Sequence, residues 1–122
     1  MPHTATKVEH KSLNMPEEVR KFEKGKLELV NVDGVMVGRA TFEPGWSWST
    51  CVKPIANTAS CMAGHFGYQI SGTLVTKMDD GAETVSKAGD VLMIPPGHDA
   101  WVEGNERVVV IDFQGFANYA KK

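Results

Sequence analysis

The chain has 122 residues, a length that suits one domain with a single hydrophobic core. Thirteen Lys and Arg residues against fifteen Asp and Glu residues give a formal net charge of −2, which argues against nucleic acid or an anionic membrane as a partner. The first residues lack the apolar region of a signal peptide, and no apolar run approaches the ~20 residues of a membrane-spanning helix, so we expect a soluble cytoplasmic protein.

Residues 1–25 are expected to form an N-terminal arm and a short helix. Residues 1–12 are polar and unpatterned, which is typical of an arm that is disordered or lies against a neighbouring subunit. Asn14-Met15-Pro16-Glu17 has the features of a helix start, with Asn14 as N-cap and Glu17 three residues later. We expect the helix near residues 15–24, ending at Gly25.

Residues 26–122 have the pattern of an antiparallel β-barrel. From Leu27 the apolar residues alternate with polar ones, and Asp33-Gly34 between two β-rich runs predicts a tight hairpin. Turn residues at 79–81, 87–90 and 103–106 separate the later β-rich runs. Further strands are expected at 46–53, 66–78, 82–86, 91–94, 99–103 and 107–114, and residues 116–122 are expected to form one helical turn.

Two segments resemble the two sequence motifs of the cupin family. The first runs from Cys61 to Gly72 and contains His65, and the second runs from Gly89 to Trp101. The resemblance covers about residues 40–115. It implies an all-β fold, the antiparallel cupin barrel (double-stranded β-helix, or jelly roll), here with the short N-terminal helix added. It also implies a pocket at the barrel mouth that holds a metal or a small-molecule ligand, and a homodimer.

The first motif of the family has a glycine, two histidines, a glutamate and a second glycine at set spacings. Counting forward from Gly45 places Cys51 and Lys53 at the histidine positions, with an insertion within residues 54–61. Counting back from Gly72 places His65 at the glutamate position, and without an insertion Ala59 and Cys61 fill the histidine positions. Both alignments stay open at this point.

The second motif fits its glycine and proline frame at Gly89, Pro95 and Gly97. Its final histidine position is Ala100, and the nearest imidazole is that of His98. The residues that usually bind the metal in this family are therefore mostly replaced.

The remaining Cys and His residues still suit a metal, because thiolate and imidazole bind zinc and also accept iron, nickel or copper. Two cysteines are too few for the disulfide framework of a small secreted domain, so we expect free thiols, with a Cys51–Cys61 disulfide as the alternative. The candidate metal ligands are Cys51, Cys61, His65 and His98. The candidate ligand-binding residues are Lys53, Gln69 and Trp101.

Trp46 and Trp48 alternate with Ser47, Ser49 and Cys51 along the strand expected at 46–53. If the cysteine faces the barrel interior, the tryptophans lie outside it. Exterior tryptophans favour burial by a second subunit, and packing under the N-terminal arm is the alternative.

Three functions are compatible with the sequence. One is a metal-dependent enzyme whose ion polarises a small oxygenated metabolite or activates water or dioxygen. Another is a non-catalytic module that binds or senses a small molecule, and the third is a stable barrel with no working pocket. The sequence names no substrate and no reaction, since the fold does not determine the function.

Overall fold

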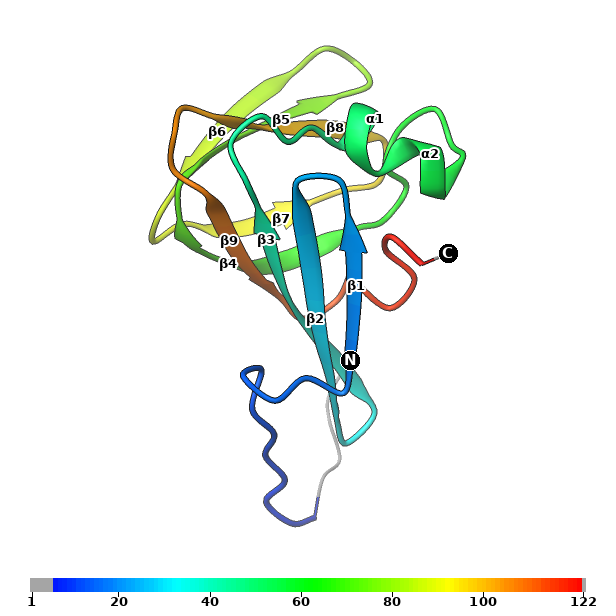
Figure 1. Cartoon of the computed structure of the whole chain (residues 1–122), viewed down its shortest axis with the longest axis vertical. Coiled ribbons are helices and arrows are strands. Elements are labelled where there is room, and N and C mark those ends of the chain that lie inside the picture. Colours follow the sequence, from blue (N-terminus) through cyan, green and yellow to red (C-terminus); the bar gives the residue numbers. More distant parts are fainter. Residues whose placement is uncertain (1–5, 122) are drawn as a thin grey trace.

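The computed structural model describes residues 6–121, which form two antiparallel β-sheets and two short helices (Figure 1). The predicted all-β antiparallel fold is therefore confirmed. The elements in chain order are β1 (Glu18–Phe22), β2 (Gly25–Val32), β3 (Val35–Phe42), α1 (Trp48–Cys51), α2 (Lys53–Ala56), β4 (His65–Ser71), β5 (Thr73–Met78), β6 (Glu83–Lys87), β7 (Val91–Ile94), β8 (His98–Glu103) and β9 (Val108–Asp112).

The larger sheet has six strands in the order β1-β2-β3-β9-β4-β7. The hairpin predicted at Asp33-Gly34 is confirmed: Val32 pairs with Val35, and both turn residues have positive φ, 46° and 85°. Because β9 lies between β3 and β4, the C-terminal strand brings residues from both ends of the domain into one sheet.

The smaller sheet has three strands in the order β6-β5-β8. The strand predicted at 66–78 is in fact two strands that belong to different sheets and meet at Gly72. This glycine has φ of +79°, and a Cβ on it would lie 2.5 Å from the Arg107 carbonyl oxygen, so only glycine fits the corner. The core between the sheets includes Leu27, Phe42, Leu74 and Val108.

The helix predicted near residues 15–24 is wrong. Glu18–Phe22 forms β1, which pairs with β2 in a hairpin closed at Lys24, a residue with φ of 59°. Pairing along β2 overrides the local capping signal. The same alternation buries Arg20 to 8% exposure while Val19 stays 45% exposed. The helices lie in the middle of the chain instead.

The strand predicted at 46–53 is also wrong, because α1 and α2 occupy this region. Ser47 acts as the N-cap of α1, its hydroxyl accepting a hydrogen bond from the Thr50 N–H at 3.2 Å, and this local bond competes with an extended chain. Trp46 and Trp48 are each 2% exposed and belong to the core. The expectation that they lie outside the barrel is therefore also wrong.

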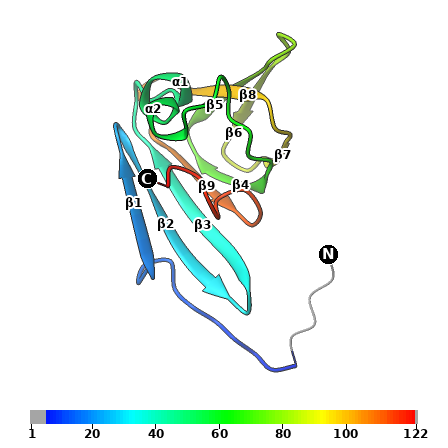
Figure 2. The same cartoon turned by 90° about the vertical axis from the view of Figure 1, so that its right-hand side faces the viewer.

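The C-terminal residues turn back over one end of the barrel without forming a helix, so the predicted helical turn is not found in residues 116–121. Figures 1 and 2 both show this red segment between α2 and β1. Neither of the two helices in the described part of the chain is long and apolar enough to cross a membrane.

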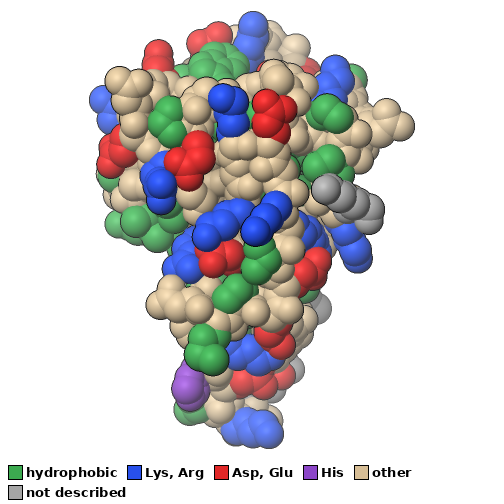
Figure 3. All heavy atoms as spheres, viewed as in Figure 1, with side chains coloured by type: hydrophobic (Ala, Val, Ile, Leu, Met, Phe, Trp, Pro, Cys, Tyr) green, Lys and Arg blue, Asp and Glu red, His purple; other side chains and the backbone are tan. Residues whose placement is uncertain are grey.

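Figure 3 shows Lys and Arg side chains across the middle of one face, with Asp and Glu among them. Ion pairs also join charged side chains of the described residues. Arg39 bonds Glu28 at 3.0 Å, and Arg107 lies 3.4 Å from Glu43. On the face shown in Figure 3 the positive charges are interspersed with negative ones.

Candidate metal centre

Cys61, His65 and His98 lie together at one end of the barrel. One ligand atom from each, a thiol sulfur or a ring nitrogen, lies within 4.8 Å of the others. Cys61 and His98 are 3% exposed, and the His65 side chain is 12% exposed. Three metal-ligating side chains thus converge in a nearly water-free place.

The backbone fixes Cys61 beside His98. The two residues form an antiparallel bridge, in which the Cys61 N–H donates to the His98 carbonyl at 2.7 Å and the Gly97 N–H donates to the Cys61 carbonyl at 2.7 Å. The turn at Pro95–Gly97 that precedes β8 is the frame of the second motif. Hydrogen bonds from this turn position Cys61, which itself lies outside the strands.

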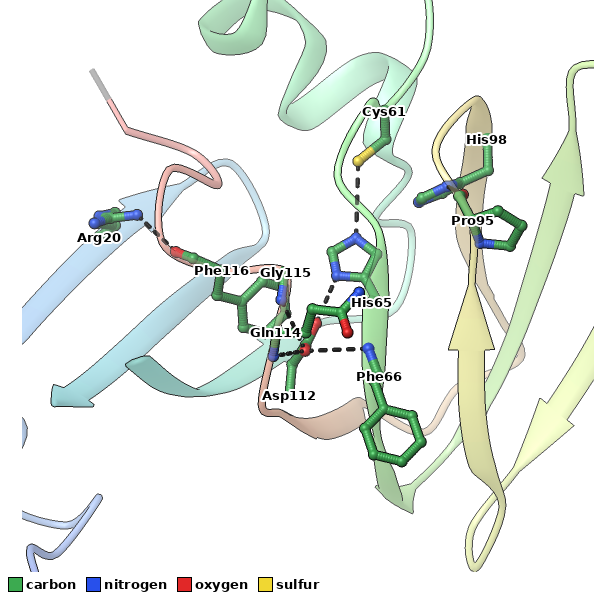
Figure 4. A network of polar contacts seen from close by, with 10 residues as sticks. All are labelled: Arg20, Cys61, His65, Phe66, Pro95, His98, Asp112, Gln114, Gly115 and Phe116. Atoms are coloured by element: carbon green, nitrogen blue, oxygen red, sulfur yellow. Dashed lines mark hydrogen bonds and ion pairs between the residues drawn. The ribbon is translucent and has the colours of Figure 1, made fainter. Parts of the chain in front are cut away.

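His65 is the first residue of β4, and Asp112 is the last residue of β9. Because β4 pairs with β9, the two side chains meet, and His65 Nδ1 lies 2.5 Å from Asp112 Oδ2 (Figure 4). The other ring nitrogen, Nε2, points at the Cys61 sulfur from 3.8 Å. A chain of contacts therefore runs from Asp112 through His65 to Cys61.

Asp112 is fully buried and held by several donors. Its Oδ1 accepts hydrogen bonds from the N–H groups of Gln114 at 2.8 Å and Gly115 at 3.0 Å, and from that of Phe66 at 3.3 Å. Burial alone would raise the pKa of Asp112, but the bonds from His65 and from these N–H groups lower it below its ordinary value. The carboxylate is therefore ionised and rigid.

The pKa values of Cys61 and His65 are both shifted in the direction that favours their charged forms. Burial works against both charges, yet the contacts with His65 and His98 lower the pKa of the Cys61 thiol to about 6. The contacts with Asp112 and Cys61 raise the pKa of His65 to about 9. Without a metal, a thiolate and an imidazolium face each other at neutral pH.

The Nδ1 atom of His98 lies 2.7 Å from the Pro95 carbonyl oxygen and donates a hydrogen bond to it. Nδ1 is therefore not available to the Cys61 thiol. This contact fixes the orientation of the ring and leaves Nε2 as the nitrogen that faces the site. Both histidines thus have Nδ1 bound to an oxygen acceptor, which leaves both Nε2 atoms for the site.

A small cavity of about 40 Å³ adjoins the two histidines. One water needs roughly 10–15 Å³ of such space. The cavity therefore has room for a few water-sized molecules beside a bound ion, but not for an organic substrate. Its wall is mostly apolar and includes Phe42, Trp46, Leu74, Ala100 and Val110.

The aromatic rings of Phe116 and Tyr119 close the site from the C-terminal side. Their centroids lie 5.3 Å and 5.7 Å from that of His65. The chain passes close to the imidazole at Gly115, where a Cβ would lie 2.3 Å from His65 Nδ1, so a larger residue has no room there.

The structure brings together three of the four predicted metal ligands. Cys51 is a buried core residue of α1 and is not part of the group. Cys61 is the residue that the alignment without an insertion places at a histidine position. His98 and Ala100 point to the same side of β8 and both line the cavity, which explains how a histidine two residues from the motif position reaches the site.

The predicted ligand-binding residues lie apart from this group. Lys53 is exposed on α2, and Trp101 is half-buried on β8. Gln69 is fully buried, and its amide nitrogen donates to the carbonyls of Gly72 at 3.0 Å and Ser86 at 3.1 Å. None of the three lines the small cavity.

Asp112, Phe116 and Tyr119 were missed by the sequence analysis. Asp112 has a recognisable signal, an acidic residue at the end of the apolar run Val108–Ile111, where burial needs a partner. The two aromatic residues give no such signal, because their role depends on how the C-terminal segment folds back.

Solved structures similar to this one share its architecture. A cupin-like protein from Thermotoga maritima matches with a TM-score of 0.54 and 20% identity, over 80% of this chain and 73% of that one. An RmlC-like cupin from Shewanella frigidimarina matches with a TM-score of 0.54 and 18% identity, over 87% and 92%. The chain has a cupin-like fold. The resemblance predicted from the two motifs is thereby confirmed at the level of the fold.

The polyketide cyclase RemF from Streptomyces resistomycificus matches this cupin-like fold with a TM-score of 0.57 and 15% identity, over 87% of this chain and 79% of that one. No family model and no curated protein matches the sequence. At identities this low the likeness concerns the fold alone, so the function has to be argued from the site.

Proposed function

We propose that this protein is a metal-dependent cupin enzyme that acts on a small oxygenated metabolite. The ion is held by the sulfur of Cys61 and the Nε2 atoms of His65 and His98. The observation that carries the proposal is the anchoring of both imidazoles. Histidines that bind metals almost always donate their second N–H to a carboxylate or a backbone carbonyl. Here His65 bonds Asp112 and His98 bonds Pro95.

The donor set fits a borderline-soft divalent ion. In a tetrahedral zinc site, bonds of about 2.3 Å to sulfur and 2.1 Å to nitrogen place the two ligand atoms about 3.6 Å apart. The Cys61 sulfur and His65 Nε2 are 3.8 Å apart, close to that separation. One thiolate and two neutral imidazoles favour zinc, while iron and nickel also accept them.

Three protein ligands leave a coordination position open, which is the arrangement of catalytic zinc sites. When bound, such an ion supplies Lewis-acid chemistry or a water activated at neutral pH. The protein's own residues orient the ligands, and the apolar wall keeps bulk water out. Asp112 compensates the charge that His65 carries whenever no ion is bound.

The experiment that tests this proposal is metal analysis of untagged protein purified without added metal. We expect close to one ion per chain, or uptake of one zinc ion when zinc is supplied. His65→Ala and Cys61→Ser should each lose most of that ion. Cys51→Ala is the matched control, because it removes the other buried thiol and should leave the stoichiometry unchanged. Failure to bind zinc, iron or nickel in the parent protein overturns the proposal.

A second candidate function rests on the contact chain Asp112–His65–Cys61. A thiol activated by an imidazole that a carboxylate orients is the arrangement of a cysteine nucleophile. This function is incompatible with the metal site, because a thiolate bound to an ion is not free to act as a nucleophile. Reaction of Cys61 with a small electrophile in the protein as purified, with no metal present, would favour it.

A further inference from the structure

Two hollows lie on either side of the Cys61–His65–His98 group. The inner one is the cavity of about 40 Å³, and the outer one is a groove of about 610 Å³ between α1, α2 and the C-terminal segment, defined here as residues 114–121. His65 and His98 line the cavity, and Cys61 lines the groove. The candidate metal site therefore lies between the two hollows.

Tyr119 belongs to the wall of both hollows. It is 8% exposed, and its ring packs on His65 and, at 5.0 Å between centroids, on Phe116. Trp48 also lines both hollows, so movement of the Tyr119 side chain removes one of the two shared wall residues and opens the cavity toward the groove. The combined space lies within the 300–1,000 Å³ typical of small-molecule sites, which the cavity alone does not reach.

The C-terminal segment is held by the Arg20 side chain and by core packing of Phe116, Tyr119 and Ala120. Arg20 Nη1 donates to the carbonyls of Phe116 at 3.0 Å and Tyr119 at 2.8 Å, and Nη2 donates to that of Ala117 at 2.9 Å. The segment joins neither sheet. Elements outside the sheet ladders have no strand pairing to break when they open, so opening of this segment costs its Arg20 bonds and the packing of Phe116 and Tyr119 but no ladder bonds.

The groove has the chemistry of a site for a mostly apolar molecule. Its apolar wall comes from Val52, Ile55, Ala56, Met62 and Ala63. Its described lining residues include no Asp or Glu, and the single charged one is Lys121, which also lies near Glu18. One thiolate and two neutral imidazoles leave the bound divalent ion itself positively charged, and the balancing Asp112 carboxylate lies behind His65 and does not fill the ion's open position. An anionic oxygen donor therefore complements the inner end of the groove.

We infer that the outer groove binds the apolar part of a small carboxylate substrate, whose head reaches the metal site when Tyr119 and the Arg20-held segment move aside. This inference rests on the proposed function and names the substrate class of the same site. The cavity is too small for any organic substrate while the segment is closed, so access requires this movement.

Hexanoate is a suitable probe, followed by NMR of the methyl groups of Met62 and Ile55 in the zinc-loaded protein. We expect hexanoate to shift both signals and hexylammonium to shift neither. Met62→Glu places a carboxylate in the groove and should weaken hexanoate binding at least 10-fold. Met15→Glu is the matched control, an exposed methionine outside the groove, and should leave binding unchanged. Hexanoate that shifts neither signal, or binds Met62→Glu as tightly as the parent, overturns the inference.

The movement of the segment is tested by the rate at which a chelator removes zinc. Tyr119→Ala and Arg20→Lys should each speed removal about 10-fold, and hexanoate should slow it in the parent. Phe113→Ala is the control, an aromatic residue that is 49% exposed beside the segment. Arg20→Lys keeps the positive charge and still tests the movement of the segment if Tyr119→Ala does not fold. Equal rates of zinc removal in Arg20→Lys and the parent would show that opening of the Arg20-held segment does not control access to the site. If no ion binds at all, the proposed function fails, and hexanoate shifts of Met62 and Ile55 measured in the metal-free protein still show whether the groove binds the apolar chain.

Discussion

His65 is oriented by Asp112, whose Oδ2 lies 2.5 Å from Nδ1 of the imidazole. This contact turns Nε2 toward the sulfur of Cys61. The carboxylate is itself fixed by three backbone N–H groups, so the direction of the imidazole is set by the end of β9. The relationship is the one expected of a metal ligand and the carboxylate behind it.

Asp112→Asn should weaken zinc binding by about 10- to 100-fold, the usual cost of losing a carboxylate behind a ligating histidine. The amide keeps the shape but not the charge that supports the ring. Competition against a chromophoric chelator gives the affinity. Asp90→Asn, an exposed acid, is the control and should bind zinc like the parent. Equal affinities for the parent and Asp112→Asn would contradict this role of the carboxylate.

Cys61→Ser should weaken zinc more than it weakens manganese, because the thiolate is the soft donor of the set and a hydroxyl is a hard one. Isothermal titration with each ion measures the ratio of the two affinities. Cys51→Ala should leave that ratio as it is in the parent. A uniform loss for both ions in Cys61→Ser would mean that sulfur does not contact the ion.

In metal-free protein, alkylation of Cys61 should follow a pKa of about 6, because the contacts with His65 and His98 outweigh burial. A lowered pKa keeps the thiolate at neutral pH, so the rate stays high above pH 7 and falls as the pH drops through 6. The measurement uses Cys51→Ala protein, which has a single thiol. Adding His65→Gln removes the imidazolium and should move the midpoint upward. An unshifted midpoint in that variant would show that His65 does not set the pKa.

Arg20→Gln should destabilise the fold by about 2–4 kcal/mol, since it leaves buried carbonyls of the C-terminal segment without their donor. Urea unfolding followed by tryptophan fluorescence measures the change. Lys21→Gln, on the exposed side of the same strand, should change stability by less than about 0.5 kcal/mol. Equal effects of the two substitutions would mean that Arg20 does not hold the segment.

The homodimer expected from the sequence stays a prediction, and its first rationale is lost because the tryptophans are buried. The outer face of β4 and the edge strand β7 offers another: Phe66, Tyr68 and Met93 are 41%, 45% and 70% exposed. Light scattering should give twice the chain mass, and Tyr68→Glu should give a monomer. A monomer mass at all concentrations of the parent protein would exclude the dimer.

The sequence analysis found the elements whose signals are local. Asp33-Gly34 requires positive φ, and the Pro95 and Gly97 frame forms the turn that holds Cys61, so both were predictable from residue type. The helix expected near Asn14 failed because pairing with β2 outweighs a capping signal. The strand expected at 46–53 was wrong because the alternation of Trp and Ser residues there fits a strand, while Ser47 is also a helix N-cap residue. The sequence pattern alone does not distinguish the two structures.

The part of the site that was predicted also has local sequence signals. Cys61, His65 and His98 belong to metal-binding residue types near motif positions, and they were proposed as ligands. Asp112 and Tyr119 act through contacts between β4, β9 and the C-terminal segment. Such contacts join residues about 50 positions apart, and no local pattern encodes them.

X-ray absorption of the zinc-loaded protein tests the central claim most directly. The account predicts one sulfur neighbour at about 2.3 Å and nitrogen neighbours at about 2.0–2.1 Å from the zinc. The sulfur signal should vanish in Cys61→Ser and persist in Cys51→Ala. A shell of oxygen and nitrogen without sulfur in the parent protein would contradict the assignment of Cys61, His65 and His98 as the metal ligands.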